Sequence, residues 1–226
     1  MSRRPNTAID TATAELFPGV PGAPIEAIAP GALLLRGFVR DDAQALLRAI
    51  ERIAAASPFR NMVTPGGFTM SVAMTNCGKA GWITDRRGYR YAEIDPLTEK
   101  PWPAMPKLFA DLAARAAATA GFADFAPDAC LVNRYEPGAR MSPHQDKDER
   151  DFTQPIVSIS LGLAATFLFG GEKRSDRPKR LRLESGDVVV WGGPARMAFH
   201  GIDPLSQGVD SLTGVYRYNL TMRKAL

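Results

Sequence analysis

The sequence predicts an α+β fold in which an antiparallel sandwich or open barrel is supported by a layer of helices. Three observations lead to this prediction. Two amphipathic helical patterns precede Gly121, short strand patterns separated by turns follow Pro127, and one hydrophobic core accounts for all of them. The chain has 226 residues, of which 45% are hydrophobic and 23% charged. This composition is that of an ordinary globular protein and excludes disordered, collagenous and fibrous classes.

The first elements follow from local patterns. Residues 1–30 are rich in Ala, Pro and Thr without periodicity and predict a flexible N-terminal arm, whereas residues 31–226 are expected to form a single domain. Residues 32–35 predict a short strand. A helix should then begin at Asp41 or Asp42, with Gln44 completing a capping box, and end at Ser57-Pro58. Its buried stripe is expected to contain Leu46, Leu47, Ile50, Ile53 and Ala54.

The remaining elements differ on the two sides of Pro127. Residues 59–103 show no regular pattern, and an irregular stretch of this length in a compact domain is usually functional. A second helix is expected from Pro106, as its first residue, to Ala120, and it should bury Leu108, Phe109, Leu112, Ala113 and Ala116. The strands expected after it are 129–135, 156–161, 166–169, 180–184, 187–191, 196–200 and 215–223.

Neither the cysteines nor the apolar runs indicate a secreted or membrane protein. Cys77 and Cys130 lack CxxC spacing and are too few for a disulfide framework, which suits a reducing cytoplasm. The longest apolar run, residues 155–171, is interrupted by serines, Gly162 and Thr166, and no apolar segment follows Arg3 and Arg4. We therefore expect a cytoplasmic protein, acting as a monomer and without membrane contact.

The excess of basic residues suits a polyanionic partner. The formal net charge is +4, and six of the basic residues fall within residues 172–182, Arg174 among them. A second basic group (Lys79, Arg86, Arg87 and Arg90) is interleaved with Trp82, Tyr89 and Tyr91. Cations pair with phosphates and aromatic rings stack on unpaired bases, so this combination favours a single-stranded nucleic acid. The alternative is a pair of solvated loops.

A metal site is indicated by the two histidines of the chain. If residues 144–146 are extended, His144 and Asp146 point to the same side and can bind one ion, which the distant His200 would complete. Two histidines and one carboxylate are the ligand set of non-haem Fe(II) oxygenases. A catalytic zinc ion and ordinary structural histidines remain alternatives, while a structural zinc site would need a fourth ligand that neither cysteine supplies.

Two strands carry polar residues that suit a small dicarboxylate. Odd positions of the last strand are Arg217, Asn219, Thr221 and Arg223, so two arginines on one face could hold the two ends of such a molecule. On strand 129–135, Asn133 and Tyr135 share one face with Leu131 and could bond the same carboxylate. The alternatives are a solvated face on the last strand and an edge strand at 129–135.

The combined motifs resemble the AlkB family of Fe(II)- and 2-oxoglutarate-dependent dioxygenases. The metal motif His144-x-Asp146 with His200, and the segment Arg217-Tyr-Asn-Leu-Thr-x-Arg223, carry the resemblance. Further similar segments are 62–67, 70–76, 94–96, 101–103, 133–135, 144–148, 158–162 and 186–193. Together they extend from about residue 31 to 223. The resemblance implies a double-stranded β-helix, or jelly-roll, core over residues 128–226, supporting N-terminal helices, and a nucleotide-recognition lid over residues 59–103.

The resemblance also implies roles for individual residues. The Fe(II) ligands would be His144, Asp146 and His200. Arg217 would bind the far carboxylate of 2-oxoglutarate with help from Asn133 and Tyr135, and Arg223 would lie by the carboxylate next to the keto group, with Asn219 between the arginines. In the lid, Trp82 would stack on the damaged base, Tyr89 would meet a backbone phosphate, and Tyr91 would complete the segment. Asp148 would face the exocyclic amine of the base, and Arg174 would reach the base or its phosphate.

The implied activity is oxidative demethylation of 1-methyladenine and 3-methylcytosine in single-stranded DNA, as direct-reversal repair. Such enzymes use Fe(II), O2 and 2-oxoglutarate, couple decarboxylation of the last to hydroxylation of the methyl group, and release formaldehyde. Three alternatives stay open. They are a related oxygenase acting mainly on RNA, a non-catalytic module that binds single-stranded nucleic acid, and a zinc hydrolase, although the hydrolase leaves the paired arginines without a task.

Overall fold

The computed structural model describes residues 24–226 of the chain. Most of the predicted N-terminal arm, residues 1–23, lies outside the described residues. The prediction of a flexible arm is wrong for its last part, because β1 (Ile25–Ala29) forms an antiparallel pair with β2 (Ala32–Leu35). This pairing makes β1 an edge strand of the main sheet.

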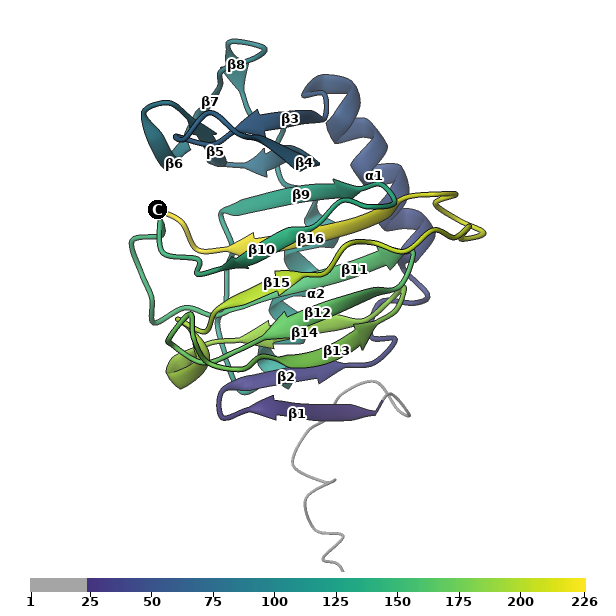
Figure 1. Cartoon of the computed structure of the whole chain (residues 1–226). Helices are drawn as coiled ribbons and strands as arrows, with labels where there is room; N and C mark the ends of the chain where they lie inside the picture. Colours follow the sequence, from purple (N-terminus) through teal and green to yellow (C-terminus); the bar gives the residue numbers. More distant parts are fainter. Residues whose placement is uncertain (1–23) are drawn as a thin grey trace, which may run out of the picture.

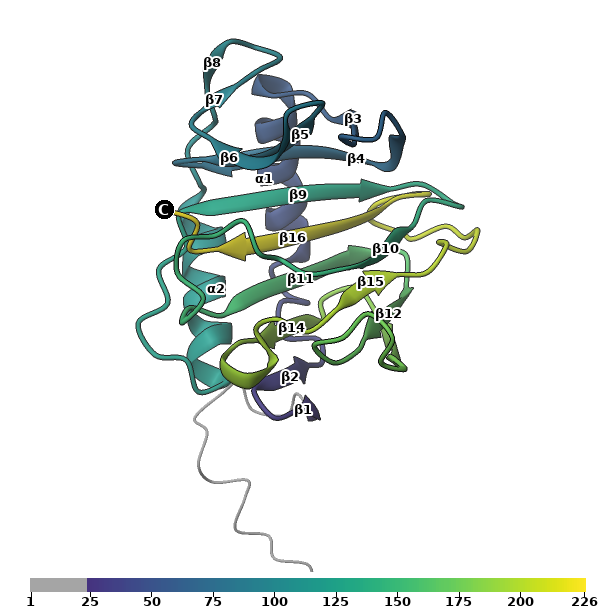
Figure 2. The same ribbon diagram turned by 60° about the vertical axis from the view of Figure 1, so that its left-hand side comes forward.

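Two antiparallel sheets face each other and form the jelly-roll core (Figures 1 and 2). The larger sheet has eight strands in the order β1-β2-β14-β11-β16-β9-β4-β3. After β1 and β2, its strands are β14 (Val188–Trp191), β11 (Ile156–Gly162), β16 (Arg217–Arg223), β9 (Ala129–Tyr135), β4 (Thr69–Gly78) and β3 (Arg60–Val63). The smaller sheet is formed by β10 (Met141–His144), β15 (His200–Ile202), β12 (Ala165–Phe169) and β13 (Lys179–Leu183).

Each face of the larger sheet covers a separate hydrophobic cluster. One cluster lies between the two sheets and includes Phe167, Phe169 and Trp191. The other lies between the larger sheet and the helices α1 (Ala43–Ala56) and α2 (Lys107–Thr119), which cover its outer face in Figure 1. Strands such as β11, every residue of which is buried, therefore read as continuous apolar runs rather than as alternating patterns.

The two helices are placed correctly by their apolar spacing, and α1 begins after Asp42, one of the two caps expected for it. Asp42 is the N-cap of α1, yet its side chain makes no capping hydrogen bond, so the expected capping box with Gln44 is wrong. The helix ends at Ser57 as expected, because Ser57 adopts an extended conformation before Pro58. In α2, Pro106 is the residue before the helix rather than its first residue.

The expectation that residues 59–103 are irregular is wrong. β3 and β4 extend the larger sheet, and two hairpins follow them, β5 (Gly81–Asp85) with β6 (Gly88–Ala92) and β7 (Ile94–Asp95) with β8 (Lys100–Pro101). The pattern is obscured because β4 is buried on both faces between Val72 and Cys77 and is built from Ala, Met and Asn, which have low or variable strand preference. Within residues 59–103, the β5–β6 and β7–β8 hairpins are the parts that do not belong to either jelly-roll sheet.

Strand boundaries after Pro127 agree with the prediction to within two residues, except around the second histidine. β9 has the predicted limits. The strand expected at 196–200 is wrong, since Gly193–Ala195 form a short 3-10 helix and His200 begins β15. β10 was not predicted. In the part of the chain that the structure describes, neither helix has the length and apolarity to span a membrane.

Candidate iron and cosubstrate site

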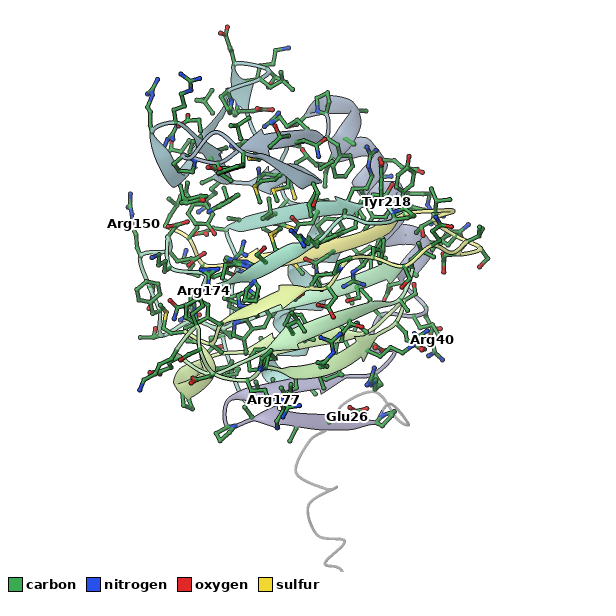
Figure 3. The ribbon with its side chains drawn as sticks, in the orientation of Figure 1. Glu26, Arg40, Arg150, Arg174, Arg177 and Tyr218 are labelled. Atoms are coloured by element: carbon green, nitrogen blue, oxygen red, sulfur yellow. The ribbon has the colours of Figure 1, made fainter. Side chains whose placement is uncertain are left out.

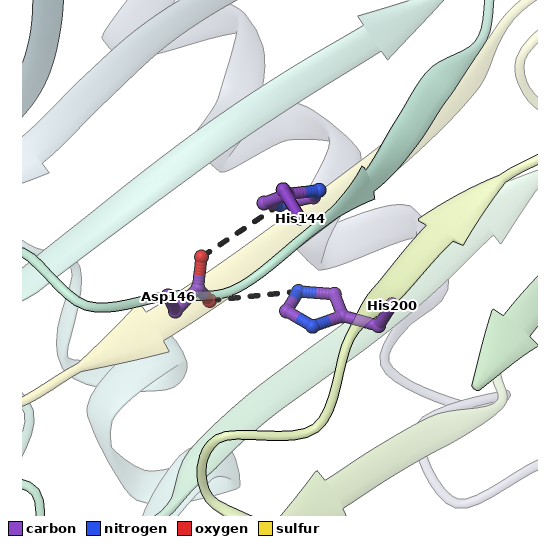
Figure 4. A group of neighbouring side chains, drawn as sticks. All are labelled: His144, Asp146 and His200. Carbon is purple, nitrogen blue, oxygen red and sulfur yellow. Dashed lines mark ion pairs between the residues drawn. The ribbon is translucent and has the colours of Figure 1, made fainter. Parts of the chain in front are cut away.

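The two histidines and Asp146 meet between β10 and β15 (Figure 4). His144 is the last residue of β10 and His200 the first of β15, and the two are partners in the antiparallel register. Asp146 lies in the loop after β10, so the expectation that it shares a strand face with His144 is wrong, although the loop still returns its carboxylate to the histidines. One ligand atom from each of the three residues lies within 4.8 Å of the others.

The orientation of the three side chains fits a divalent metal ion. Asp146 Oδ1 lies 3.7 Å from Nε2 of His144, and its Oδ2 lies 3.7 Å from Nε2 of His200. The Nδ1 atoms lie 2.9 Å and 3.0 Å from the carbonyl oxygens of Ser142 and Ala198. Because carbonyls only accept, each Nδ1 carries the proton and each Nε2 keeps its lone pair for a metal.

Burial and charge keep these ligands in the forms that bind metal. Burial, followed by the neighbouring His144, lowers the pKa of His200 to about 4, so its ring is neutral at pH 7. Burial opposes ionisation of Asp146, but Arg223 and the histidines outweigh it and hold the pKa of the carboxyl below its usual range. A neutral imidazole and an ionised carboxylate are the states in which His and Asp bind Fe(II).

Arg217 is a buried cation with unused donors. Its side chain is fully buried, and its Nη2 donates to Ser160 Oγ at 3.0 Å. Within residues 24–226, its Nε and Nη1 have no hydrogen-bond partner. Burial lowers the pKa of Arg217 to about 10, because the guanidinium has lost water without gaining a carboxylate. An anionic ligand such as a carboxylate of 2-oxoglutarate would supply the missing acceptors.

Polar residues of β9 and β11 surround the same face of β16. Tyr135 is the register partner of Arg217, and Asn133 is that of Asn219. Asn133 Nδ2 donates to Asn219 Oδ1 at 3.2 Å, and Asn219 Nδ2 donates to Ser158 Oγ at 2.7 Å. The four odd positions of β16 are thus buried, and the alternative of a solvated face is wrong.

Arg223 joins the cosubstrate face to the metal ligands. Its Nε and Nη2 donate to Asp146 Oδ2 at 2.9 Å and 2.6 Å. Both donors reach the oxygen that lies 3.7 Å from His200 Nε2, so Arg223 fixes the carboxylate beside the histidines. The two ends of β16 therefore have different surroundings, since Arg217 has donors without a partner among the described residues and Arg223 is paired with Asp146 of the candidate metal triad.

The predicted lid residues form one aromatic stack and two hydrogen bonds to the loop that follows Asp146. Trp82 in β5 stacks on Tyr89 in β6, with ring centroids 5.6 Å apart and an interplanar angle of 16°. The indole N–H of Trp82 donates to Asp148 Oδ2 at 2.7 Å. The hydroxyl of Tyr91 donates to Glu149 Oε1 at 2.6 Å. The stacked rings of Trp82 and Tyr89 are thus joined to Asp148, which follows Asp146 by two residues in the chain.

Arg174 borders the metal site from the other side. Its side chain is exposed (Figure 3). Its Nη2 donates to the carbonyl of Pro143, the residue before His144, at 2.7 Å. Its guanidinium also lies over the ring of Phe199, 5.7 Å from the centroid. Arg174 is therefore close to the iron ligands but remains accessible to a charged ligand.

Two buried residues of the site were missed by the sequence analysis. Glu149 and Arg196 form an ion pair of 3.0 Å, and both side chains are almost fully buried. Glu149 follows Lys147 and Asp148 in a highly charged segment that resembles a solvated loop, so no local signal indicates its burial. Arg196 lies in a segment that was expected to be a strand, and only the tertiary contacts reveal its position.

Comparisons with known proteins agree with this geometry. The sequence profile of the 2OG-Fe(II) oxygenase superfamily matches residues 31–223. The alpha-ketoglutarate-dependent dioxygenase AlkB of Escherichia coli is 62% identical over 200 residues, which cover 88% of this chain and 93% of that protein. An Arabidopsis thaliana relative named DNA N(6)-methyladenine demethylase ALKBH1D is 31% identical and is matched over 87% of this chain and 50% of its own.

A solved structure supports the same assignment. The structure of OsALKBH1 superposes with a TM-score of 0.79 and 29% identity, covering 89% of this chain and all of that one. The enzyme therefore uses Fe(II), 2-oxoglutarate and O2, as the fit of the triad and of Arg217 requires. The chain belongs to the 2OG-Fe(II) oxygenase superfamily and, within it, to the AlkB family of α-ketoglutarate-dependent dioxygenases.

Proposed function

We propose that this dioxygenase oxidatively removes methyl groups from 1-methyladenine and 3-methylcytosine in single-stranded DNA. The observation that carries the proposal is the position of Trp82, Tyr89 and Asp148 beside the metal triad. Aromatic faces can stack on an unpaired base, and a carboxylate can attract a ring that methylation has made cationic. A small-molecule or protein substrate would not require both features.

The chain holds the reactants in the following way. His144, Asp146 and His200 hold the iron ion. Arg217, with Tyr135 and Asn133, binds the far carboxylate of 2-oxoglutarate, while Arg223 and Asn219 lie at the other end. When bound, the iron and 2-oxoglutarate supply the oxidation: O2 is consumed, 2-oxoglutarate becomes succinate and CO2, and the methyl carbon gains a hydroxyl. The N–CH2OH product then loses formaldehyde and leaves the unmodified base.

The pairing edge of the base must reach the iron. N1 of adenine and N3 of cytosine lie on that edge, so the base has to be unpaired or flipped out of the helix. We assign Trp82 to stacking on the base, Tyr89 and Arg174 to phosphate contacts, and Tyr91 to support of the hairpin. Trp82 donates to Oδ2 of Asp148, and a carboxylate has a second oxygen, so Asp148 can accept from the exocyclic amine while it keeps the indole hydrogen bond.

The proposal includes the location and assembly of the enzyme. All residues assigned to the site come from one chain, and both cysteines are free and buried. We therefore propose a monomer that acts in the cytoplasm. Size-exclusion chromatography coupled to light scattering checks the assembly, and a dimer mass would contradict it.

The test is a demethylation assay on defined oligonucleotides. Purified protein is incubated with Fe(II), 2-oxoglutarate, ascorbate and a single-stranded DNA containing one 3-methylcytosine. Mass spectrometry should show loss of one CH2 unit that depends on both Fe(II) and 2-oxoglutarate. Matched RNA, duplex DNA and unmethylated DNA are the controls. Faster reaction on RNA would favour the RNA oxygenase, and succinate formation without demethylation of any oligonucleotide would contradict the proposed substrate.

A further inference from the structure

Two consecutive carboxylates attach the β5–β6 hairpin to the loop that carries the iron ligand. Trp82 and Tyr91 are register partners in the hairpin, so their side chains lie on the same face. Trp82 donates to Asp148, and Tyr91 donates to Glu149. The two attachments differ in burial, because Trp82 and Asp148 are half-buried whereas Glu149 is buried. A ligand can therefore reach the Trp82–Asp148 hydrogen bond and replace it, whereas Glu149 is enclosed by protein.

Glu149 contacts three separate parts of the fold, accepting hydrogen bonds from two of them and forming an ion pair with the third. Its Oε1 accepts from the Tyr91 hydroxyl at 2.6 Å and lies 3.3 Å from Arg223 Nε, while its Oε2 accepts from Arg196 Nη2 at 3.0 Å. These partners belong to the hairpin, to the last strand of the main sheet and to the segment before β15. One side chain thus connects the hairpin to the arginine that contacts the iron ligand.

Arg196 holds the same loop through its backbone. It donates from Nη1 to the carbonyl of Asp146 at 2.7 Å and from Nε to the carbonyl of Gln154 at 3.1 Å. Asp146 and Glu149 carry two negative charges, and Arg196 and Arg223 carry two positive charges. All four side chains are buried. Removing one of these charges leaves an oppositely charged side chain buried without its partner, which is unfavourable. The position of each of the four side chains therefore depends on the others.

We infer that Glu149 is a positioning residue that holds Arg223 for 2-oxoglutarate and Tyr91 for the nucleotide hairpin at one shared anchor. The inference rests on the proposed role of Arg223 at the cosubstrate. Arg223 donates from Nε and Nη2 to Asp146, and Glu149 Oε1 lies 3.3 Å from the same Nε, so an ion pair with Glu149 also holds the guanidinium. A glutamine at 149 would keep the shape but remove one acceptor oxygen and the negative charge, which would free both Arg223 and Tyr91 to move.

The experiment measures cosubstrate affinity without turnover. Full-length Glu149→Gln is loaded with Fe(II) under anaerobic conditions, and 2-oxoglutarate is titrated while its visible charge-transfer band with iron is recorded. The dissociation constant for 2-oxoglutarate should rise about tenfold, as expected when a charged hydrogen-bond partner is lost. The matched control is Glu184→Gln, which removes a carboxylate from an exposed pair with Arg182 and should leave the titration unchanged.

A second variant keeps the test valid if Glu149→Gln does not fold. Tyr91→Phe removes only the hydroxyl that donates to Glu149, so it should raise the 2-oxoglutarate dissociation constant about threefold and weaken oligonucleotide binding as well. Wild-type cosubstrate affinity in folded Glu149→Gln or in Tyr91→Phe would overturn the inference. Because the titration contains no nucleic acid, its result is independent of whether the proposed DNA substrate is correct.

Discussion

The two faces of β16 are both buried, but their side chains are satisfied in different ways. Leu220 and Met222 pack into the cluster beneath the helices, where apolar neighbours provide every contact they need. Arg217, Asn219 and Arg223 face the space between the sheets, where Arg217 keeps donors unused by the described chain. The outer face of the strand therefore stabilises the fold by itself, whereas the inner face is completed by a ligand.

This comparison separates buried residues that serve stability from buried residues that serve binding. A fully buried leucine contributes through contacts that exist in every folded molecule. A fully buried arginine with one partner costs free energy in the absence of a ligand, and recovers part of it only when a carboxylate arrives. The following predictions test that separation, beginning with the largest effect.

Asp146→Ala should abolish iron binding and reduce turnover to background. The variant removes the only carboxylate of the triad and leaves two imidazoles, which bind Fe(II) much more weakly. Metal content after Fe(II) loading, measured by elemental analysis, and demethylation of a methylated oligonucleotide are the two measurements. Substantial activity in the variant would show that His144, Asp146 and His200 do not hold the metal as assigned.

Leu220→Ala should lower the free energy of unfolding by about 3 kcal/mol without changing cosubstrate affinity. Leu220 is fully buried between Ile159 and Val132 of the neighbouring strands, and its truncation leaves a void under the helices. Urea unfolding measures the stability, and 2-oxoglutarate titration of the folded protein measures the affinity. A marked loss of affinity would show that the two faces are not independent.

Arg217→Met should have the opposite profile. The dissociation constant for 2-oxoglutarate should rise about a hundredfold, or about 2.7 kcal/mol, because a carboxylate loses its forked partner. The free energy of unfolding should stay constant or increase, since methionine is of similar length and carries no charge to desolvate. Urea unfolding and 2-oxoglutarate titration measure the two quantities. A strongly destabilised variant would show that Arg217 stabilises the fold and does not serve binding alone.

Asp95→Asn tests a buried charge that the chain itself satisfies. Asp95 accepts from Ser57 Oγ at 2.6 Å and from the Leu97 amide at 2.9 Å, and it pairs with Arg60 at 2.6 Å. Burial raises the pKa of Asp95, but these partners outweigh it and lower the pKa overall. The variant should be less stable by about 2 kcal/mol at pH 7.

The effect of Asp95 should also depend on pH. Because its carboxyl pKa is lower in the folded than in the unfolded protein, the stabilisation is present above the ordinary value of about 3.9 and is lost as the pH falls below it. Urea unfolding at a series of pH values should therefore show wild type and variant converging in acid. A constant difference would mean that the charge of Asp95 is not the source of the stability.

Trp82→Ala should produce the smallest effect and confine it to the nucleic acid. Loss of one stacking ring should weaken binding of a methylated oligonucleotide about tenfold. The affinity for 2-oxoglutarate should not change, because Trp82 contacts Asp148 rather than Arg217 or Arg223. Fluorescence anisotropy and anaerobic titration measure the two affinities. A fall in cosubstrate affinity alone would contradict the assignment of Trp82 to the hairpin.

Local patterns in the sequence were enough to predict the helices, most strands of the jelly roll and the three residues that the fold brings together as a candidate metal triad. Helical spacing placed α1 and α2, because one face of each must be apolar to cover the sheet. With two histidines in the chain, a His-x-Asp motif and a second, distant histidine left few ligand sets to consider. The alternation of β16 also predicted which of its residues share a face.

Tertiary structure decided what each face meets. β1, β4 and β10 form strands because partners supply their hydrogen bonds and burial, although their own residues do not alternate clearly. Asp146 returns to the histidines from a loop rather than from the strand, and Glu149 is buried in a segment whose composition suits solvent. Burial of a charge depends on partners that are remote in sequence, such as Arg196 and Arg223, so it can be determined only from the folded chain.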